Sequence, residues 1–185
     1  SELSSADGAR LRLKIVTGGD SDAVEDAEKA IDNQRAYAQR HGYDFEVMVG
    51  NWAEPWMPYW HKIMVLLKEL ESHEGDGSEV PGAVIWMDLD VVVTNPPQRM
   101  LERILSAHPK QAIILAQDPM RGDRLPGARR VKRMVNTGII LARRSRGAVR
   151  VLRKLLDYGR EFPRAAHLPQ DANTLHEQDA FNWLL

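Results

Sequence analysis

The sequence predicts an α/β fold, with one domain whose mostly parallel central sheet carries helices on both faces. Short apolar runs alternate along the chain with longer segments whose apolar residues recur at helical spacing, the order that strand–helix–strand units produce. With 185 residues, of which 43% are hydrophobic and 28% charged, the chain can bury one core and is hardly long enough for two. We therefore predict a single domain over 1–185 that begins with a flexible N-terminus at 1–10.

Two strand–helix units open the chain. The stretch 11–18 alternates and then turns apolar, which predicts a first strand. Ser21 is placed to cap a helix over 22–41, in which small apolar residues recur at helical spacing. Gly42 is expected to end that helix, because glycine readily adopts the left-handed conformation of a C-cap. A second strand is predicted over 43–49.

A loop, a helix and the most apolar strand occupy the middle of the chain. The aromatic and proline-rich segment 52–60 predicts a loop. One apolar face then indicates a helix, formed by Tyr59, Ile63, Leu66, Leu67 and Leu70. The stretch 82–87 is apolar throughout and predicts a buried central strand. Pro96 and Pro97 are expected to open the next helix. Its inward face would consist of Met100, Leu101, Ile104 and Leu105.

The C-terminal part continues the pattern with two more strands and two helices. Strands are predicted at 112–116 and 135–142, and the glycines, prolines and charges of 118–134 predict an irregular loop between them. A helix over 145–158, capped by its first serine, has a predicted buried stripe of Val151, Leu152, Leu155 and Leu156. A last helix is expected to start near Glu177.

Two aspartates directly follow the apolar strand. Asp88 and Asp90 stand at its carboxyl end in the run GAVIWMDLDVVVTNP, and open α/β sheets bind ligands at that edge. Residues i and i+2 of an extended strand point to the same face, so both carboxylates reach one hard cation if the backbone stays extended. Such a cation suits a diphosphate ligand. The structural alternative is one helix-capping aspartate and one solvated aspartate.

Composition excludes several classes of function. The chain has a net charge of −1 and is not broadly basic, so the sequence does not predict that it binds nucleic acid. No apolar run approaches the roughly 20 residues that cross a bilayer, so no membrane segment is predicted in this chain. The absence of cysteine removes disulfides and cysteine-ligated zinc. The oligomeric state stays open.

The chain resembles one family of glycosyltransferases in strings that follow one another in the family's order. These strings are NQRAYAQRHGYDFEV, YWHKIMVLLKEL, WMDLDVVVTNP, NTGIILARR and EQDAFNWLL. They are similar to the GT-A glycosyltransferases, specifically the retaining family of mannan galactosyltransferases and xyloglucan xylosyltransferases. The resemblance implies a single Rossmann-like GT-A domain. It also implies transfer of a hexose or pentose from a UDP-sugar to a saccharide acceptor, with retention of configuration and with Mn²⁺ or Mg²⁺.

The resemblance further implies a donor site. Asp88 and Asp90 match the family's D-x-D pair, which would hold Mn²⁺ against the donor diphosphate. Lys62 matches a lysine near the donor sugar or phosphate, and its alternative is a solvated helix lysine. The other matching positions are Val16, Thr17 and Gly18 at the nucleotide, and Asn136 and Gly138 in an N-x-G turn at the sugar. A strand-start asparagine and a bulge glycine are the alternatives for that turn.

The catalytic group implied by the resemblance lies near the C-terminus. Gln178 and Asp179, with Glu177 beside them, match the acid/glutamine pair that the family places by the reacting anomeric carbon, where Asn136 also contacts the sugar. The alternative is a helix start that favours acids. Because a neutral amide is a poor nucleophile, we expect front-face attack. Gln178 would stabilise positive charge, and the leaving phosphate would help to deprotonate the acceptor.

One departure from the family concerns the metal. The family usually supplies a third ligand, often a histidine, after the acid/glutamine pair, and only six residues follow Asp179. His167 and His176 are the nearest histidines before the pair. The other sources are a C-terminal segment beyond Leu185, or water and donor oxygens in place of a protein ligand. Without a third ligand, the chain would be a UDP-sugar- or glycan-binding module or an incomplete fragment. A nucleotidyltransferase is less favoured, because GGDSD at 18–22 is a poor phosphate loop.

The expected partners are a nucleotide sugar and a saccharide acceptor. Four aromatic side chains either stack on the acceptor or pack together as a loop core. These are Trp52, Trp56, Tyr59 and Trp60. The compartment stays open. The resemblance implies the Golgi lumen if the chain is part of a longer, anchored protein, whereas the lack of cysteines and of N-x-S/T sites favours the cytoplasm.

Overall fold

Strands and helices alternate along the chain, as the sequence predicts. The computed structural model describes residues 11–50, 58–72, 81–118, 134–165 and 177–184. The elements are β1 (Leu13–Gly19), α1 (Ser21–Asp26), α2 (Glu28–His41), β2 (Asp44–Val49), η1 (Pro58–Trp60), α3 (His61–Glu71), β3 (Ala83–Met87), α4 (Met100–Ala107), β4 (Ile113–Gln117), β5 (Val135–Arg143), α5 (Arg146–Ala165) and α6 (Glu177–Leu184). Among these residues, no helix is both long and apolar enough to span a membrane.

The five strands form one mixed sheet in the order β2-β1-β3-β5-β4. β1 pairs in parallel with β2 and β3, whereas β5 runs antiparallel to both β3 and β4. All strands except β5 therefore point in the same direction, which confirms the predicted α/β class. The reversal of β5 has a functional consequence. Met87, at the end of β3, is paired with Ile139 in the middle of β5, so the first residues of β5 lie at and beyond the carboxyl edge of β3.

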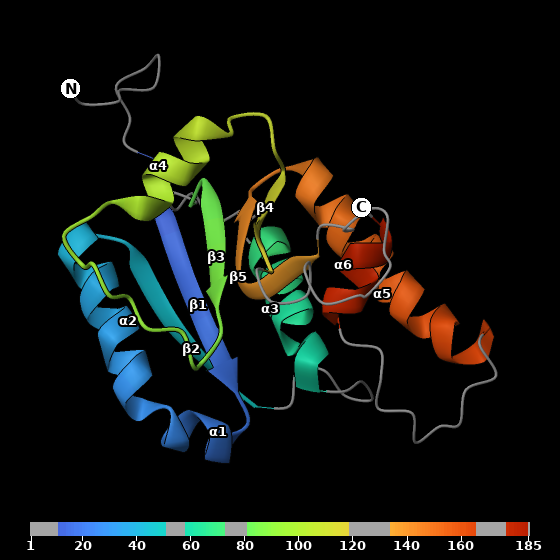
Figure 1. Cartoon of the computed structure of the whole chain (residues 1–185), viewed down its shortest axis with the longest axis horizontal. Coiled ribbons are helices and arrows are strands. Elements are labelled where there is room, and N and C mark those ends of the chain that lie inside the picture. Colours follow the sequence, from blue (N-terminus) through green and yellow to red (C-terminus); the bar gives the residue numbers. More distant parts are fainter. Residues whose placement is uncertain (1–10, 51–57, 73–80, 119–133, 166–176, 185) are drawn as a thin grey trace, which may run out of the picture.

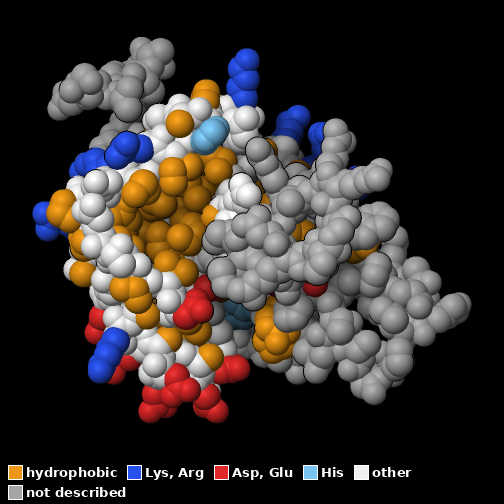
Figure 2. Space-filling model, viewed as in Figure 1, with side chains coloured by type: hydrophobic (Ala, Val, Ile, Leu, Met, Phe, Trp, Pro, Cys, Tyr) orange, Lys and Arg blue, Asp and Glu red, His pale blue; other side chains and the backbone are white. Residues whose placement is uncertain are grey.

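Helices cover both faces of the sheet (Figure 1). α3, α5 and α6 pack on one face around Val16, Ile63, Leu66, Val84, Trp86, Ile140, Leu152, Leu155 and Phe181. α2 and α4 pack on the other face around Leu13, Ile15, Tyr37, Ala38, Ile85, Met87, Leu101, Leu105 and Leu141. Hydrophobic side chains gather between α2 and α4 in Figure 2, and acidic side chains gather over α1. Every residue of β3 is buried, which confirms the predicted central strand.

The first predicted helix divides into two. α1 ends at Asp26, and α2 begins after Ala27, whose backbone N–H closes the end of α1. Asp20 caps α1 instead of Ser21, because its carboxylate accepts a hydrogen bond of 2.9 Å from the Ala23 N–H. Gly42 ends α2 as predicted, with a φ of 69° in the left-handed region.

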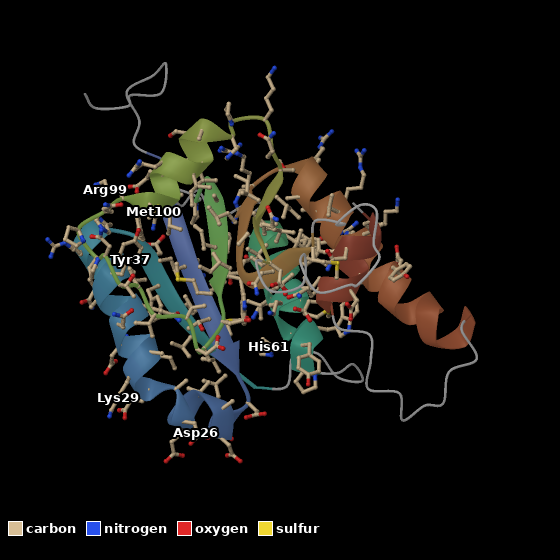
Figure 3. The ribbon with its side chains drawn as sticks, viewed as in Figure 1. Asp26, Lys29, Tyr37, His61, Arg99 and Met100 are labelled. Atoms are coloured by element: carbon tan, nitrogen blue, oxygen red, sulfur yellow. The ribbon has the colours of Figure 1, made fainter. Side chains whose placement is uncertain are left out.

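One expectation about a helix start and three about buried faces are wrong. α4 begins at Met100, and Pro96 and Pro97 lie in a turn ahead of it. Met100 is 45% exposed at the outer start of the helix (Figure 3), while Leu101 and Leu105 face the core. Tyr59 precedes α3 and is also exposed, as is Val151 on α5. The predicted N-terminus 1–10, the loop residues 52–57 and 119–133, and His167 and His176 lie outside the described residues.

Candidate active site

A pocket of about 260 Å³ lies where β3 ends and β5 begins. It brings together segments that are far apart in the sequence: the start of α3, the residue after β3, the first turn of α6 and the start of β5. The lining residues are Tyr59, Lys62, Asp88, Asn136, Thr137, Gly138, Glu177, Gln178 and Asp179. The structure thus unites six sequence-predicted site residues, which are Lys62, Asp88, Asn136, Gly138, Gln178 and Asp179.

Lys62 is the central cation of this pocket. Its ammonium nitrogen Nζ lies 2.8 Å from Asp88 Oδ1 and 3.1 Å from Glu177 Oε1. It also donates a hydrogen bond of 3.2 Å to the carbonyl of Thr137. The side chain of Lys62 is only 10% exposed and that of Glu177 only 4%. The alternative of a solvated helix lysine is therefore wrong, because Lys62 joins two carboxylates from different elements.

Asp88 is held from several sides. The indole Nε1 of Trp86 donates to Asp88 Oδ1 at 2.6 Å, Lys62 donates to Oδ2 at 3.0 Å, and the Asp88 N–H donates to the Gly138 carbonyl at 2.8 Å. Burial raises the pKa of Asp88 above its ordinary value, and the Glu177 carboxylate adds to that rise. Lys62 and Trp86 oppose the rise in pKa without cancelling it. The structure therefore favours the neutral form more than water does.

The raised pKa of Asp88 predicts a pH dependence of stability in metal-free protein. The folded state binds this proton more tightly than the unfolded state, so the contribution of Asp88 to stability is full below about pH 3.8 and is lost as pH rises toward the folded pKa. Urea unfolding in EDTA, from pH 3.5 upward, should show the free energy of unfolding falling relative to an Asp88→Asn variant. A difference that rises with pH would show a lowered pKa instead.

Thr137 connects the strand to α6. Its hydroxyl donates to Glu177 Oε1 at 2.6 Å, and its backbone N–H donates to Gln178 Oε1 at 3.3 Å. A backbone N–H can only donate, so the Gln178 side chain presents its oxygen to Thr137 and leaves its NH₂ group for other contacts. Glu177 Oε2 is buried and has no hydrogen-bond partner among the described residues.

Thr137 is the pocket residue that the sequence did not single out, and Glu177, named with the matched pair, was given no role of its own. Glu177 was only the neighbour of the matched pair, and Thr137 lies between two matched residues of β5. Period-two alternation would have placed the Thr137 side chain on the face opposite to Asn136 and Gly138, so it gave no signal that all three residues line one pocket. No sequence signal predicts the contact of Glu177 with Lys62, because it depends on how α6 packs beside α3.

Asn136 and Gly138 lie in an irregular part of β5. Leu115 of β4 pairs with Ile140 and the next residue pairs with Asn136, so 137–139 bulge out of the β4–β5 ladder, while Ile139 still pairs with Met87 of β3. Asn136 Oδ1 accepts a hydrogen bond of 2.9 Å from the Gly138 N–H. A β-carbon on Gly138 would lie 3.0 Å from Asn136 Oδ1 and 3.5 Å from Asp88 Oδ2. Gly138 therefore lies in the bulge and also lines the pocket, so the two interpretations of this glycine hold together.

The remaining predicted residues do not line this pocket. Val16 is buried in the core, and a β-carbon on Gly18 would lie 2.1 Å from the Met48 carbonyl oxygen, so strand packing requires this glycine. Thr17 is buried, and its hydroxyl has no partner within the described ranges. Asp90 is exposed in a turn. The backbone therefore does not stay extended after Asp88, and strand geometry alone does not align the two carboxylates.

The carboxylates at the end of β3 are the groups that could hold a divalent cation. Within the part of the chain that the structure describes, no group of three or more His, Asp or Glu side chains could enclose a metal ion. Asp88 and Asp90 offer carboxylate oxygens, the ligands that Mg²⁺ and Mn²⁺ prefer, and such ions commonly take their other ligands from phosphate and water. Lys62 and Trp86 donate hydrogen bonds to the Asp88 carboxylate, but they do not fill all of its acceptor positions, which number about four. Asp88 would thus keep acceptor positions for an ion that shares its ligands with a bound phosphate, and Asp90 would have to meet that ion from the exposed turn.

Comparison with solved structures shows the fold. The chain is similar to a glycosyltransferase involved in the glycosylation of the major capsid of PBCV-1, with a TM-score of 0.63 and 14% identity over 94% of this chain and 77% of that one. It is similar to galactosyltransferase LgtC, with a TM-score of 0.50 and 12% identity over 92% and 70% of the two chains. It is also similar to mouse xyloside xylosyltransferase 1, with a TM-score of 0.50 and 12% identity over 94% of this chain and 81% of that one.

Comparison of sequences identifies the family. A search of curated proteins gave no match. The model of the galactosyl transferase GMA12/MNN10 family, by contrast, matches residues 13–185, almost the whole chain. The predicted GT-A fold and the prediction of a transferase enzyme are both confirmed. The chain belongs to the galactosyl transferase GMA12/MNN10 family and is a glycosyltransferase.

Proposed function

We propose that this glycosyltransferase moves a hexose or pentose from a UDP-sugar to a saccharide acceptor with retention of configuration. We also propose that it requires Mn²⁺ or Mg²⁺ held by Asp88 and Asp90. The observation that carries the proposal is the pocket itself, in which Lys62, Asp88 and Gln178 meet from three separate elements at the carboxyl edge of the sheet. Open α/β sheets bind their ligands at this edge.

The charge of the pocket supports the requirement for a divalent cation. Its lining contains three carboxylates, from Asp88, Glu177 and Asp179, and one ammonium, from Lys62, a formal charge of −2 when all are ionised. A diphosphate would be repelled by this pocket unless a cation accompanied it. When bound, the cation would neutralise the charge that grows on the departing nucleoside diphosphate. Lys62 holds Asp88 in place beside that position.

The same carboxylates suit the sugar. In glycosyl transfer the anomeric carbon becomes positively charged, and negative side chains that are already in place stabilise that charge without reorganising. Glu177 is held by Lys62 and Thr137 before any ligand arrives. Gln178 lies next to it in the lining. Retention by front-face attack leaves the departing phosphate as the base that takes the acceptor proton, so no further basic residue is required.

Tyr59 is the aromatic residue placed to meet an acceptor. It lines the pocket, and 45% of its surface is exposed. Trp60, its neighbour, is buried in the core, so it packs there and does not stack on an acceptor. Trp52 and Trp56 lie outside the described residues. An exposed ring at the edge of a polar pocket suits the apolar face of a sugar.

A transfer assay tests the proposal. The protein would be incubated with a panel of UDP-hexoses and UDP-pentoses and with oligosaccharide acceptors, in Mn²⁺ or in EDTA, and the anomeric configuration of the product would be read by NMR. We expect transfer from at least one UDP-sugar, in Mn²⁺ only, with retention. Equal transfer in EDTA would contradict the metal requirement, and an inverted product would contradict retention. Transfer only from a sugar linked to another nucleotide would contradict the donor.

Gln178→Ala is expected to lower kcat by about a hundredfold while the affinity for UDP stays close to that of the unaltered protein. The reason is that Gln178 is proposed to act on the charge that develops at the sugar, and UDP lacks that sugar. Steady-state kinetics and calorimetric titration with UDP would measure the two quantities. Asn182→Ala is the matched control, because Asn182 also binds a β5 backbone N–H from α6 but does not line the pocket. Unchanged kcat in Gln178→Ala would end this role.

A further inference from the structure

A polar stripe on α2 holds the segment that leaves the end of β3. In Figure 1 this segment runs beside α2 before it reaches α4. Side chains of the stripe bind backbone atoms between 88 and 98, and they are Asn33, Gln34, Tyr37 and His41. Tyr37 points from α2 toward this segment, whereas Lys29 of the same helix points to solvent (Figure 3). The stripe lies beside the buried apolar residues Ile31 and Ala38 of the same helix.

Gln34 binds the turn that carries the two aspartates. Its side-chain NH₂ donates one hydrogen bond to the Asp88 carbonyl and another to the Val91 carbonyl, both at 2.9 Å. The Asp88 carbonyl also accepts from the Val91 N–H at 3.1 Å, which closes the turn. Gln34 is 0% exposed. Both amide hydrogens of a fully buried side chain are thus used on this turn.

Asn33 binds the next part of the same segment at two points. Its Oδ1 accepts from the Val93 N–H at 2.7 Å, and its Nδ2 donates to the Val93 carbonyl at 3.2 Å. A side-chain amide that binds both the N–H and the C=O of one residue acts as a neighbouring strand would. Together with Gln34, it fixes the backbone on both sides of Asp90.

The need for this support follows from the fold. β3 ends at Met87, and beyond it Asp88 keeps a backbone bond to β5 only through the Gly138 carbonyl. Buried backbone groups that leave a sheet need other partners. Asn33 and Gln34 supply them, and neither residue lines the pocket. They act on the backbone of the aspartate turn and not on the contents of the pocket.

We propose that Asn33 and Gln34 are positioning residues of the donor site, which hold the turn so that Asp88 and Asp90 stay in place to bind a nucleoside diphosphate with its divalent cation. This inference rests on the proposed function, because it takes Asp88 and Asp90 as the residues that meet the donor. It adds that their placement depends on side chains of α2, on the opposite side of the turn from the pocket.

The test compares Gln34→Leu and Asn33→Asp with Tyr37→Phe. Gln34→Leu removes both bonds to the turn, and Asn33→Asp is a milder change that keeps the acceptor for the Val93 N–H. Tyr37→Phe is the matched control, because it removes a bond of 3.1 Å from the same helix to the same segment at Gln98, beyond the turn. Calorimetry would measure the affinity for UDP in Mn²⁺, hydrogen exchange would follow 88–93 in the free protein, and thermal unfolding would report stability.

We expect Gln34→Leu to weaken UDP·Mn²⁺ binding by about 10-fold to 100-fold, the range typical of residues that orient metal ligands. Asn33→Asp should weaken binding less. Both should speed exchange in 88–93. Tyr37→Phe should lower stability and leave the affinity unchanged. If Gln34→Leu does not fold, the affinity and the hydrogen exchange of Asn33→Asp test the positioning role by themselves.

Two failures are distinguishable. If the unaltered protein does not bind UDP with Mn²⁺, the proposed donor is wrong. If the unaltered protein binds and the α2 variants bind equally well, or if they lose no more affinity than Tyr37→Phe, the positioning role is wrong while the proposed donor stands. Unchanged exchange in 88–93 would likewise overturn the positioning role, whatever the donor.

Discussion

Replacing Asp88 by asparagine is expected to lower kcat/KM for sugar transfer by about a hundredfold to a thousandfold, the loss found when one charge-stabilising group is removed from an active site. Asparagine keeps the shape of the side chain and an acceptor for the Trp86 indole, which lies 2.6 Å from Asp88 Oδ1. It removes the negative charge that faces Lys62 and that is proposed to hold the cation. Steady-state kinetics with the preferred UDP-sugar would measure the effect.

The control for Asp88→Asn is a buried carboxylate in a similar ion pair elsewhere. Glu69 of α3 lies 2.7 Å from Lys14 Nζ and has a side chain that is 6% exposed. It is absent from the pocket lining. Glu69→Gln should cost stability and leave kcat/KM for folded protein close to normal. If Asp88→Asn retained most of its activity, or if Glu69→Gln lost as much, Asp88 would have no special role in the reaction.

Replacing Lys62 by methionine is expected to destabilise the protein by about 3 kcal/mol at neutral pH, because removing one partner of a buried ion pair leaves the other charge buried and unpaired. Methionine retains most of the volume, so packing changes little. The charge left behind is mainly that of Glu177, whose side chain is 4% exposed. Asp88 is more exposed, so water compensates part of its loss. Urea unfolding would measure the change in the free energy of unfolding.

A second substitution shows whether charge is the cause. Lys62→Met combined with Glu177→Gln removes the uncompensated carboxylate, and it should recover more than half of the stability lost in Lys62→Met alone. Lys14→Met combined with Asp88→Asn is the control pair, since Lys14 bonds to Glu46 and Glu69 and not to Asp88. If the first pair of changes were simply additive, Lys62 and Glu177 would not be energetically coupled.

The residues that sequence predicted best are those whose position follows from local pattern. The apolar stretch ending at Met87 predicted both the central strand and an aspartate at its carboxyl edge. Gly42 ends its helix in the left-handed conformation, because a C-cap is decided within one turn. The family resemblance then indicated Lys62 and Gln178, which the structure places in the same pocket as Asp88.

The features that sequence did not predict depend on contacts between distant elements. The reversal of β5 is set by its pairing with β3 and β4, and no periodicity records strand direction. Gln34 interrupts the apolar face of its helix, and the reason for a polar residue there is its hydrogen bond to the turn at Asp88. Glu177 resembled an ordinary acid at a helix start, and its ion pair with Lys62 requires α6 and α3 to be packed together.

The most direct measurement is calorimetric titration of the protein with UDP in Mn²⁺, in Mg²⁺ and in EDTA, together with the same titrations of Asp88→Asn. We expect saturable binding of one UDP in Mn²⁺ or Mg²⁺, little binding in EDTA, and little binding to Asp88→Asn under any condition. Equal affinity in EDTA, or full metal-dependent affinity in Asp88→Asn, would show that the pocket at Asp88 does not bind a nucleoside diphosphate through a divalent cation.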